Sequence, residues 1–347
     1  MDARNQKPQL VMIKSDIPDD VLFNILIKLP LKTLLRFKSV SKRWHSLIQD
    51  PILIKFNSDI SKNHIYLFGR DDIYLDGHLS LYSITRGGEI SSVSTNVLPH
   101  CHTRVAYCNG LLCFLTEVNK TFYLCNPTTR AQIELPRSGF FSATFGFGYK
   151  PSTNKYIVVQ ISYWDGCHVF TLGSDSWRAI SSKPANYNFY GESFFFNGAL
   201  HWSGYGMIVS FDLETETFGS IPYPNTASCF FRDLHEFDGY LCMIARKFDD
   251  HNLFSLWVLK DYRNHFWVNQ SFELPLIVSK NESPRVAIQN GDVLTTTHRS
   301  NPQHNHLHSY NLRSHFSTTI ELPRLLSEKS VLVVGNYVQN LVSLRNM

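Results

Sequence analysis

Five histidines near the C-terminal end are the residues best suited to hold a metal ion. Three of them occupy alternate positions, so on a β-strand their rings would point to one side and could ligate zinc. The neighbouring Asn301, Pro302 and Asn305 instead indicate a loop that leads into a strand. A metal site needs ligands held by fixed hydrogen bonds, so we expect no metal here. The five are His298, His304, His306, His308 and His315.

The other motifs that could carry chemistry are weaker. The group His100-Cys101-His102 is a poorer metal candidate than the five histidines. The stretch Gly146-Phe147-Gly148 lacks the third glycine of a dinucleotide-binding loop, because Pro151 stands there and no helical pattern follows. The stretches 126–129 and 214–216 are typical of turns whose side chains bond their own backbone. No G-x-S-x-G serine is present. The sequence therefore indicates no catalytic set, and we expect no cofactor.

Composition restricts the class of protein. The 347 residues are 43% hydrophobic and 18% charged, enough for two domains with a sizeable core. The net charge of +4 is only mildly basic, which argues against a nucleic-acid binder. Seven cysteines without a C-x-x-C pair suit a reducing compartment, where Cys113, Cys125 and Cys242 would serve as small hydrophobic residues. No apolar run near the N-terminus is long enough for a membrane span or a signal peptide, so we expect the cytosol or the nucleus.

The stretch from Asp16 to Ile48 has the pattern of three short helices. Apolar residues in its first part recur at the spacing of one helical stripe, with Pro18 in the first turn and Pro30 after the last. A second apolar helix should follow Pro30, and Ser41 is a plausible N-cap for a third helix. The stripe residues are Val21, Leu22, Ile25, Leu26 and Leu29.

So small a helical unit has too little interior to bury all of its apolar side chains, and it contains no cysteine. Part of its surface should therefore be covered by something else. One reading is a docking module for a helical partner. The other is a helical cap that folds onto the following domain, and periodicity alone favours neither.

From about His64 onward, short β-rich runs alternate with turns. Six hairpin-like pieces recur at intervals of 41, 47, 41, 46 and 53 residues, and four Asn-Gly or Asp-Gly dipeptides precede strands of their own. Periods of this length are typical of four-stranded propeller blades, with an irregular β-sandwich as the alternative. We expect the tail from Ser330 to Leu344 to complete the first or the last blade. The last apolar residues before the hairpin turns are Ile84, Cys125, Leu172, Leu213, Leu259 and Leu312.

Several of these runs also resemble known families. Ile17-Pro18-Asp19-Asp20-Val21-Leu22, Leu34-Leu35-Arg36-Phe37-Lys38 and Val40-Ser41-Lys42-Arg43-Trp44 resemble an F-box, a module that docks on a Skp-family adaptor and thereby on a cullin-RING ubiquitin ligase. Asn109-Gly110-Leu111-Leu112-Cys113, Asp175-Ser176-Trp177-Arg178 and Leu256-Trp257-Val258-Leu259 are similar to the plant F-box-associated domain, which is kelch-like. The likeness spans residues 15 to about 343, with Gln339-Asn340 where that family more often shows Glu-Ser.

The resemblance implies an α+β multidomain protein: a flexible leader (1–14), a three-helix F-box (15–55) and an all-β, propeller-like, kelch-type domain (64–344). It further implies a non-catalytic substrate receptor of an SCF-type ubiquitin ligase that binds a protein client of unknown identity, and neither nucleic acid nor membrane. Two alternatives remain open, a propeller enzyme with its site in the central channel and a nucleic-acid binder that uses the basic helices. The expected adaptor-binding residues are Pro18, Val21, Leu22, Ile25, Leu29, Pro30, Val40 and Trp44.

The client cannot be identified from the sequence, but propeller loops are where binding usually occurs. Five regions between the expected strands are therefore candidates for client contact. They are Arg70–Asp76, Tyr163–Cys167, Asn186–Tyr190, Asn225–Asp233 and His298–His306.

Overall fold

The computed structural model divides into two compact units, Met1–Asn57 and Ser58–Met347, each considered by itself below. The structure describes residues 17–29, 31–50, 52–53, 56, 65–70, 79–85, 89–98, 103–116, 120–140, 144–224, 229–247, 253–273, 285–297, 306–322, 326, 330–334, 337–339, 341–342 and 344. None of the helices in these ranges has the length and apolar character needed to cross a membrane.

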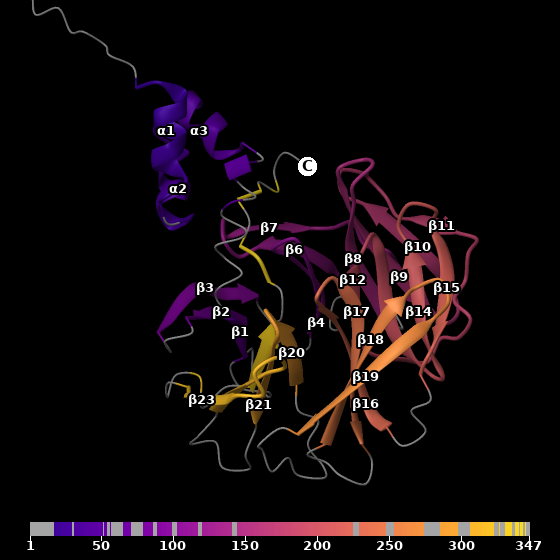
Figure 1. Ribbon diagram of the computed structural model, residues 1–347. Coiled ribbons are helices and arrows are strands. Elements are labelled where there is room, and N and C mark those ends of the chain that lie inside the picture. Colours follow the sequence, from indigo (N-terminus) through magenta and orange to yellow (C-terminus); the bar gives the residue numbers. More distant parts are fainter. Residues whose placement is uncertain are drawn as a thin grey trace, which may run out of the picture. The chain divides into compact units, whose positions relative to one another are not determined.

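The first unit contains the three expected helices, α1 (Asp19–Leu26), α2 (Leu31–Phe37) and α3 (Lys42–Ile48) (Figure 1). Ser41 caps α3 as the sequence predicts, since its hydroxyl accepts a hydrogen bond of 3.2 Å from the Trp44 backbone N–H. The interior is small, in keeping with the length of the unit. Its fully buried apolar side chains are Leu22, Leu26, Leu34, Ile48 and Leu53.

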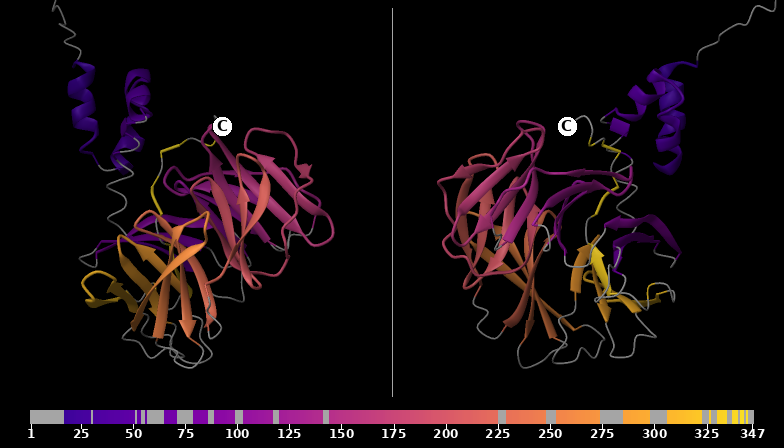
Figure 2. Two further views of the ribbon diagram at one scale, coloured as in Figure 1. Left: turned by 45° about the vertical axis from the view of Figure 1, so that its right-hand side comes forward. Right: turned by 180° about the vertical axis from the view of Figure 1, so that it is seen from behind.

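The second unit is a six-bladed β-propeller, in which every blade is a four-stranded antiparallel sheet (Figures 1 and 2). This confirms the propeller prediction over the β-sandwich. From the inner to the outer strand, blade I is β24 (Ser330–Val334), β1 (Ile65–Arg70), β2 (Leu79–Ile84) and β3 (Ile90–Leu98); blade II is β4 (Thr103–Cys108), β5 (Leu111–Thr116), β6 (Phe122–Asn126) and β7 (Ala131–Glu134); blade III is β8 (Thr144–Lys150), β9 (Lys155–Ser162), β10 (Gly166–Thr171) and β11 (Arg178–Ile180); blade IV is β12 (Phe189–Phe196), β13 (Ala199–Gly204), β14 (Met207–Asp212) and β15 (Thr217–Pro222); blade V is β16 (Cys229–Phe237), β17 (Tyr240–Lys247), β18 (Leu253–Asp261) and β19 (Phe266–Glu273); blade VI is β20 (Arg285–Gln289), β21 (Asp292–Thr297), β22 (His306–Asn311) and β23 (Ser317–Glu321).

Blade I joins the two ends of the propeller chain. Strand β24 pairs antiparallel with β1, with Tyr66 opposite Val334 and Arg70 opposite Ser330 (Figure 2). The residues after β24 continue along blades I and II, where the buried Tyr337 packs its ring 4.8 Å from that of Tyr66. The Asn126 amide donates a hydrogen bond of 2.8 Å to the Val342 carbonyl. The expectation that the C-terminal tail completes the first or last blade is therefore confirmed.

Turn chemistry sets the register of the blades. The four predicted Asn-Gly and Asp-Gly dipeptides each connect the first two strands of a blade, and both of their residues have positive φ, for example 48° at Asn197 and 78° at Gly198. Only residues that tolerate positive φ allow so tight a hairpin. The six apolar residues expected before the hairpin turns all lie at or next to the end of the third strand of a blade. Two hairpins per period thus form each blade, as the sequence predicts.

Apolar side chains fill the spaces between blades in six buried clusters. Gly146 and Gly148 on β8 explain the Gly-Phe-Gly stretch noted in the sequence. A Cβ at Gly146 would lie 2.7 Å from side-chain atoms of both Leu200 and Trp202, and one at Gly148 would lie 2.7 Å from the Leu213 side chain. These glycines allow blade IV to pack closely on blade III and have no part in phosphate binding.

The cysteines that the structure describes are free thiols in this interior, as expected for small hydrophobic residues. Cys113 and Cys242 are completely buried, and Cys125 is 3% exposed. Burial raises the pKa of Cys125 to about 12 and that of Cys167 to about 11. At neutral pH these thiols are therefore protonated and unreactive.

Two buried histidines make the propeller sensitive to acid. Burial lowers the pKa of His201 to about 4, although hydrogen bonds with the Phe194 and Ala199 backbone act in the opposite direction, and burial lowers the pKa of His235 to about 4. Between the ordinary pKa of 6.5 and this value, the unfolded chain binds protons that the folded chain does not. The free energy of unfolding should therefore be fully retained above pH 6.5 and should fall, as pH decreases to about 4, by up to ~1.4 kcal/mol per pH unit for each histidine.

The variant His235→Gln tests this expectation, because it removes one of the two groups. Urea unfolding at about pH 7 and about pH 5, followed by tryptophan fluorescence, should show a loss of stability on acidification that is about 2 kcal/mol smaller in the variant than in the parent chain. An equal loss in both proteins would show that His235 is not kept neutral by burial.

Candidate functional site

The helical unit exposes several large apolar side chains. On α1, Val21 is 44% exposed and Ile25, one turn later, is 45% exposed. Ile17, just before the helix, is 47% exposed, and Val40, after α2, is 59% exposed. Because Val21 and Ile25 are four residues apart, they lie on the same side of α1. This side is an apolar surface that faces solvent.

Polar contacts hold α1 in place at its start. Pro18 occupies the N-cap position, and Asp19 and Asp20 place negative charge in the first turn, where the helix dipole favours it. The Arg43 guanidinium on α3 lies 2.6 Å from the Asp19 carboxylate and also donates a hydrogen bond to the Ile17 carbonyl. These contacts fix the segment that carries the exposed apolar residues.

An aromatic contact connects the other two helices. The rings of Phe37 on α2 and Trp44 on α3 meet edge to face, with their centroids 5.0 Å apart. Trp44 is half-buried, which gives it a packing role inside the unit. The three helices thus form a support, and the apolar face of α1 is the part of it left accessible.

The structure separates the expected adaptor-binding residues into two groups. Pro18, Val21, Ile25 and Val40 are exposed. Leu22 is only 2% exposed and belongs to the interior, while Leu29 and Trp44 are partly buried. Pro30 lies outside the described residues. The sequence analysis did not select the exposed Ile17, Ile52 and Phe56, which fall outside the main helical stripe; for Ile17 the signal was its place directly before the helix start.

The basic residues of the helical unit only partly follow the expectation of a solvated face. Lys28, Arg36 and Lys42 are exposed. Lys38 is partly buried, and this burial lowers its pKa. Arg43 is engaged with Asp19.

The histidine stretch near the C-terminus has other partners. His306 and His308 lie on β22 with ring centroids 5.9 Å apart. His308 Nδ1 is 3.0 Å from the Thr319 hydroxyl, and His315 Nδ1 is 2.9 Å from the Tyr310 hydroxyl. His298, His304 and the His100–His102 group lie outside the described residues. Within the described ranges, no three metal-ligating side chains come together.

The two ends of the propeller differ in construction. At one, which we call the turn end, tight turns join the first strand of a blade to the second and the third to the fourth. At the other, the loop end, connections run from second to third strands and from blade to blade. Strand β1 begins, and β24 ends, at the turn end. All five regions expected to contact a client connect strands at the loop end, although many of their residues lie outside the described ranges.

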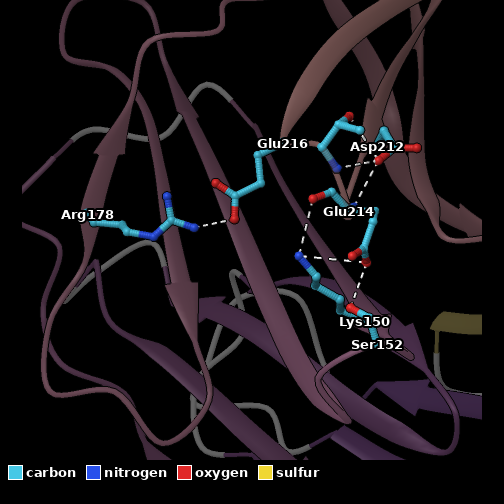
Figure 3. Close-up of polar contacts among 7 residues, drawn as sticks. Lys150, Ser152, Arg178, Asp212, Glu214 and Glu216 are labelled. Carbon is cyan, nitrogen blue, oxygen red and sulfur yellow. Dashed lines mark hydrogen bonds and ion pairs between the residues drawn. The ribbon is translucent and has the colours of Figure 1, made fainter.

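At the turn end, the acidic turn between β14 and β15 is not a solvated tip (Figure 3). The Asp212 carboxylate accepts hydrogen bonds of 2.8 and 2.7 Å from the Glu214 and Thr215 backbone N–H groups, which is the expected turn chemistry. The Glu214 carboxylate, however, accepts a hydrogen bond of 2.7 Å from Ser152 and lies 3.7 Å from the Lys150 ammonium. Glu216 pairs with Arg178. This turn therefore connects blade IV to blade III.

At the loop end, aromatic side chains of blades III and IV are exposed. Tyr163 and Trp164 follow β9, with exposed fractions of 52% and 82%, and Tyr205 follows β13. The Tyr163 ring lies 5.9 Å from that of Trp164 and 5.8 Å from that of Tyr187. The Tyr205 backbone is bonded to the segment before β12, since its N–H donates to the Asn188 carbonyl at 3.1 Å. Rigid, exposed tyrosine and tryptophan side chains are common anchors in protein interfaces.

Comparison with known proteins relates both units to described families. The F-box domain model matches residues 15–56, and the model of the F-box associated beta propeller domain matches residues 78–340. A putative F-box protein of Arabidopsis thaliana is 27% identical over 82% of this chain and 75% of its own length. An F-box/LRR-repeat/kelch-repeat protein of the same plant is 31% identical over 61% of this chain and 62% of its own length.

Solved structures show the same propeller architecture without close sequence similarity. TolB from Acinetobacter baumannii covers 82% of this chain and 73% of its own length, with a TM-score of 0.52 and 11% identity. A chain of a nidogen/laminin complex covers 78% of this chain and 97% of its own length, with a TM-score of 0.50 and 10% identity. At such identities the likeness concerns the fold alone.

Proposed function

Because this chain belongs to the family of F-box proteins with an F-box-associated β-propeller domain, we propose that it is the substrate receptor of an SCF-type ubiquitin ligase. In this proposal, residues 15–55 dock on a Skp-family adaptor, and residues 64–344 bind the protein client. The observation that carries it is the exposed apolar side of α1, in the segment that the F-box model matches.

The adaptor contact would be centred on the exposed members of the expected set. Val21 and Ile25 lie one turn apart on α1 and offer a continuous apolar surface to a partner helix. Pro18 and Val40 from the expected set, together with Ile17, add exposed apolar area. Leu22, Leu29 and Trp44 would act through the shape of the module, and Pro30 stays in the proposed set as the sequence predicts.

The mechanism we propose is proximity. A client held on the propeller near a ubiquitin-charged enzyme experiences a greatly raised effective concentration, so transfer to its lysines becomes effectively intramolecular. No side chain of this chain then needs to make or break a bond, and it would act as a non-catalytic subunit. The free buried thiols suit a reducing compartment, so we place the complex in the cytosol, the nucleus or both.

The client would bind at the loop end. The exposed Tyr163, Trp164 and Tyr205 give this end rigid anchors on two neighbouring blades. Because β1 begins at the turn end, the loop end is the end of the propeller away from the point where the chain enters it. These observations support the proposal but do not identify the client.

Capture of clients under proteasome inhibition tests the proposal. Full-length protein should co-purify with a Skp-family adaptor and with ubiquitin-modified proteins that accumulate when the proteasome is inhibited. A variant with Tyr163→Ala, Trp164→Ala and Tyr205→Ala should keep the adaptor and lose those proteins. If the adaptor is absent from the parent complex, or the same proteins remain bound to the triple variant, the corresponding half of the proposal is wrong.

A further inference from the structure

A cavity of about 620 Å³ lies at the turn end of the propeller. Its walls come from blades II, IV and V, which contribute the ends of the inner strands β4, β12 and β16 together with the turn that follows β18. This volume is typical of sites for small molecules or single side chains with their flanking backbone. The cavity is distinct from the α1 surface and from the loop end.

Aromatic rings form much of the cavity wall. Phe194 and Phe196 come from blade IV, and Tyr240 and Tyr262 from blade V. The Tyr262 hydroxyl lies 3.0 Å from Nε2 of His201, a fully buried side chain of β13, so Tyr262 is anchored across the blade boundary. A ring held in this way can present its face or edge to a ligand without a large loss of side-chain entropy.

One carboxylate in the cavity is free to bind a partner. Glu236 is partly buried, and among the described residues it forms neither a hydrogen bond nor an ion pair. A partly desolvated carboxylate without a partner favours the approach of a cation. Nearby Tyr107 reports the same potential, since burial raises its pKa and the Asp233 and Glu236 carboxylates raise it further.

The opposite rim already holds a cation against an aromatic ring. The Lys260 ammonium lies 3.8 Å from the centroid of the Tyr240 ring, within the range of a cation–π contact. Lys260 is exposed and carries its charge on a flexible side chain. Its position shows that this wall accepts positive charge, and it also makes Lys260 a competitor for any cation that enters.

From these contacts we propose that the cavity binds an organic cation, an alkylammonium or guanidinium group, with Glu236 as its counter-ion and the rings of Tyr240 and Tyr262 beside it. The cation can come from a small amine or from a lysine or arginine side chain of a bound polypeptide. Both present the same group to Glu236. This inference is independent of the proposed adaptor docking.

Calorimetric titration of the full-length protein tests the site with probes of matched size and opposite charge. The parent chain should bind 2-phenylethylamine and should not bind 3-phenylpropionate. Glu236→Gln should weaken amine binding by about tenfold or more, because the counter-ion is lost while the side-chain shape is kept. Lys260→Gln should strengthen it, because a competing cation is removed. Glu321→Gln, a charge removal at an exposed position on β23, should leave it unchanged.

A capped peptide that contains one lysine, compared with its norleucine analogue, distinguishes the two sources of the cation. Tighter binding of the lysine peptide than of the amine would assign the site to a polypeptide, and the reverse would assign it to a small amine. The proposal is overturned if neither cation binds at about 10 mM, if Glu236→Gln binds the amine as the parent does, or if 3-phenylpropionate binds and Lys260→Gln abolishes its binding. Thermal unfolding of each variant confirms that it is folded.

Discussion

Full-length protein carrying Val21→Glu together with Ile25→Glu should bind a Skp-family adaptor at least about 100-fold more weakly than the parent chain. Both side chains are nearly half exposed, so the substitutions cost the folded helical unit little. In the complex, two carboxylates would be taken out of water without partners, and an unpaired buried charge is costly. Calorimetry or surface-plasmon measurements with purified adaptor provide the readout.

Two controls separate a lost contact from a lost fold. Phe266→Glu with Val268→Glu places the same charges on exposed apolar positions of β19 and should leave adaptor binding unchanged. Leu26→Ala should destabilise the helical unit by about 2–5 kcal/mol, since Leu26 is fully buried, and should weaken binding through unfolding that circular dichroism detects. Adaptor binding of the folded α1 double variant at the parent's affinity would refute α1 as the docking helix.

A chain that ends at residue 329 should not form a stable propeller. The truncation removes β24, the inner strand of blade I, and leaves the backbone of β1 without its partner. It also removes the buried Tyr337, Leu341 and Leu344. Burial of three such side chains contributes roughly 5–9 kcal/mol, which is comparable to the whole stability of a domain. The cooperative unfolding transition of the propeller, followed by tryptophan fluorescence, should disappear at 25 °C.

Shorter truncations locate the effect. Removal of residues 345–347 should leave the transition unchanged. A chain that ends at Val334 keeps β24 but loses Tyr337 and the residues that pack beside it, so it should unfold at an intermediate urea concentration. An unchanged transition in the chain that ends at residue 329 would show that closure of blade I is not needed for stability.

The sequence predicts the helices well but divides their faces poorly. Apolar residues on α1 occur in adjacent pairs, Val21 with Leu22 and Ile25 with Leu26, which makes a stripe too wide for one buried side. Only the packing of three helices shows that Leu22 and Leu26 point inward while Val21 and Ile25 remain exposed. For this reason Leu22 entered the expected adaptor set, and a test substitution there would disturb the fold as well as the surface.

The propeller could be predicted because its turns have local causes. Asn-Gly and Asp-Gly dipeptides with positive φ recur at the same place in four blades, and this recurrence needs no tertiary information. Blade III has no such dipeptide after β8, and blade I takes its inner strand from the other end of the chain. These two blades could be inferred only from the period of the repeat and from the need to close the ring.

The cavity at the turn end could not be predicted by spacing. Tyr107, Phe194 and Glu236 come from three inner strands, of which β4 and β16 are far apart in sequence. The acidic turn at Glu214 and Glu216 gave a similar difficulty, since its partners Lys150 and Arg178 lie on the neighbouring blade. Contacts between blades depend on how the sheets pack, and no local pattern records them.

Hydrogen–deuterium exchange of the full-length protein with and without a Skp-family adaptor tests the central claim most directly. Amides in short surface helices exchange readily unless they are covered. We expect the adaptor to slow exchange across α1 and the segment around Val40, and to leave the propeller blades unaffected. Unchanged exchange in residues 17–50 at saturating adaptor, or protection confined to the propeller, would contradict the docking of this helical unit on the ligase.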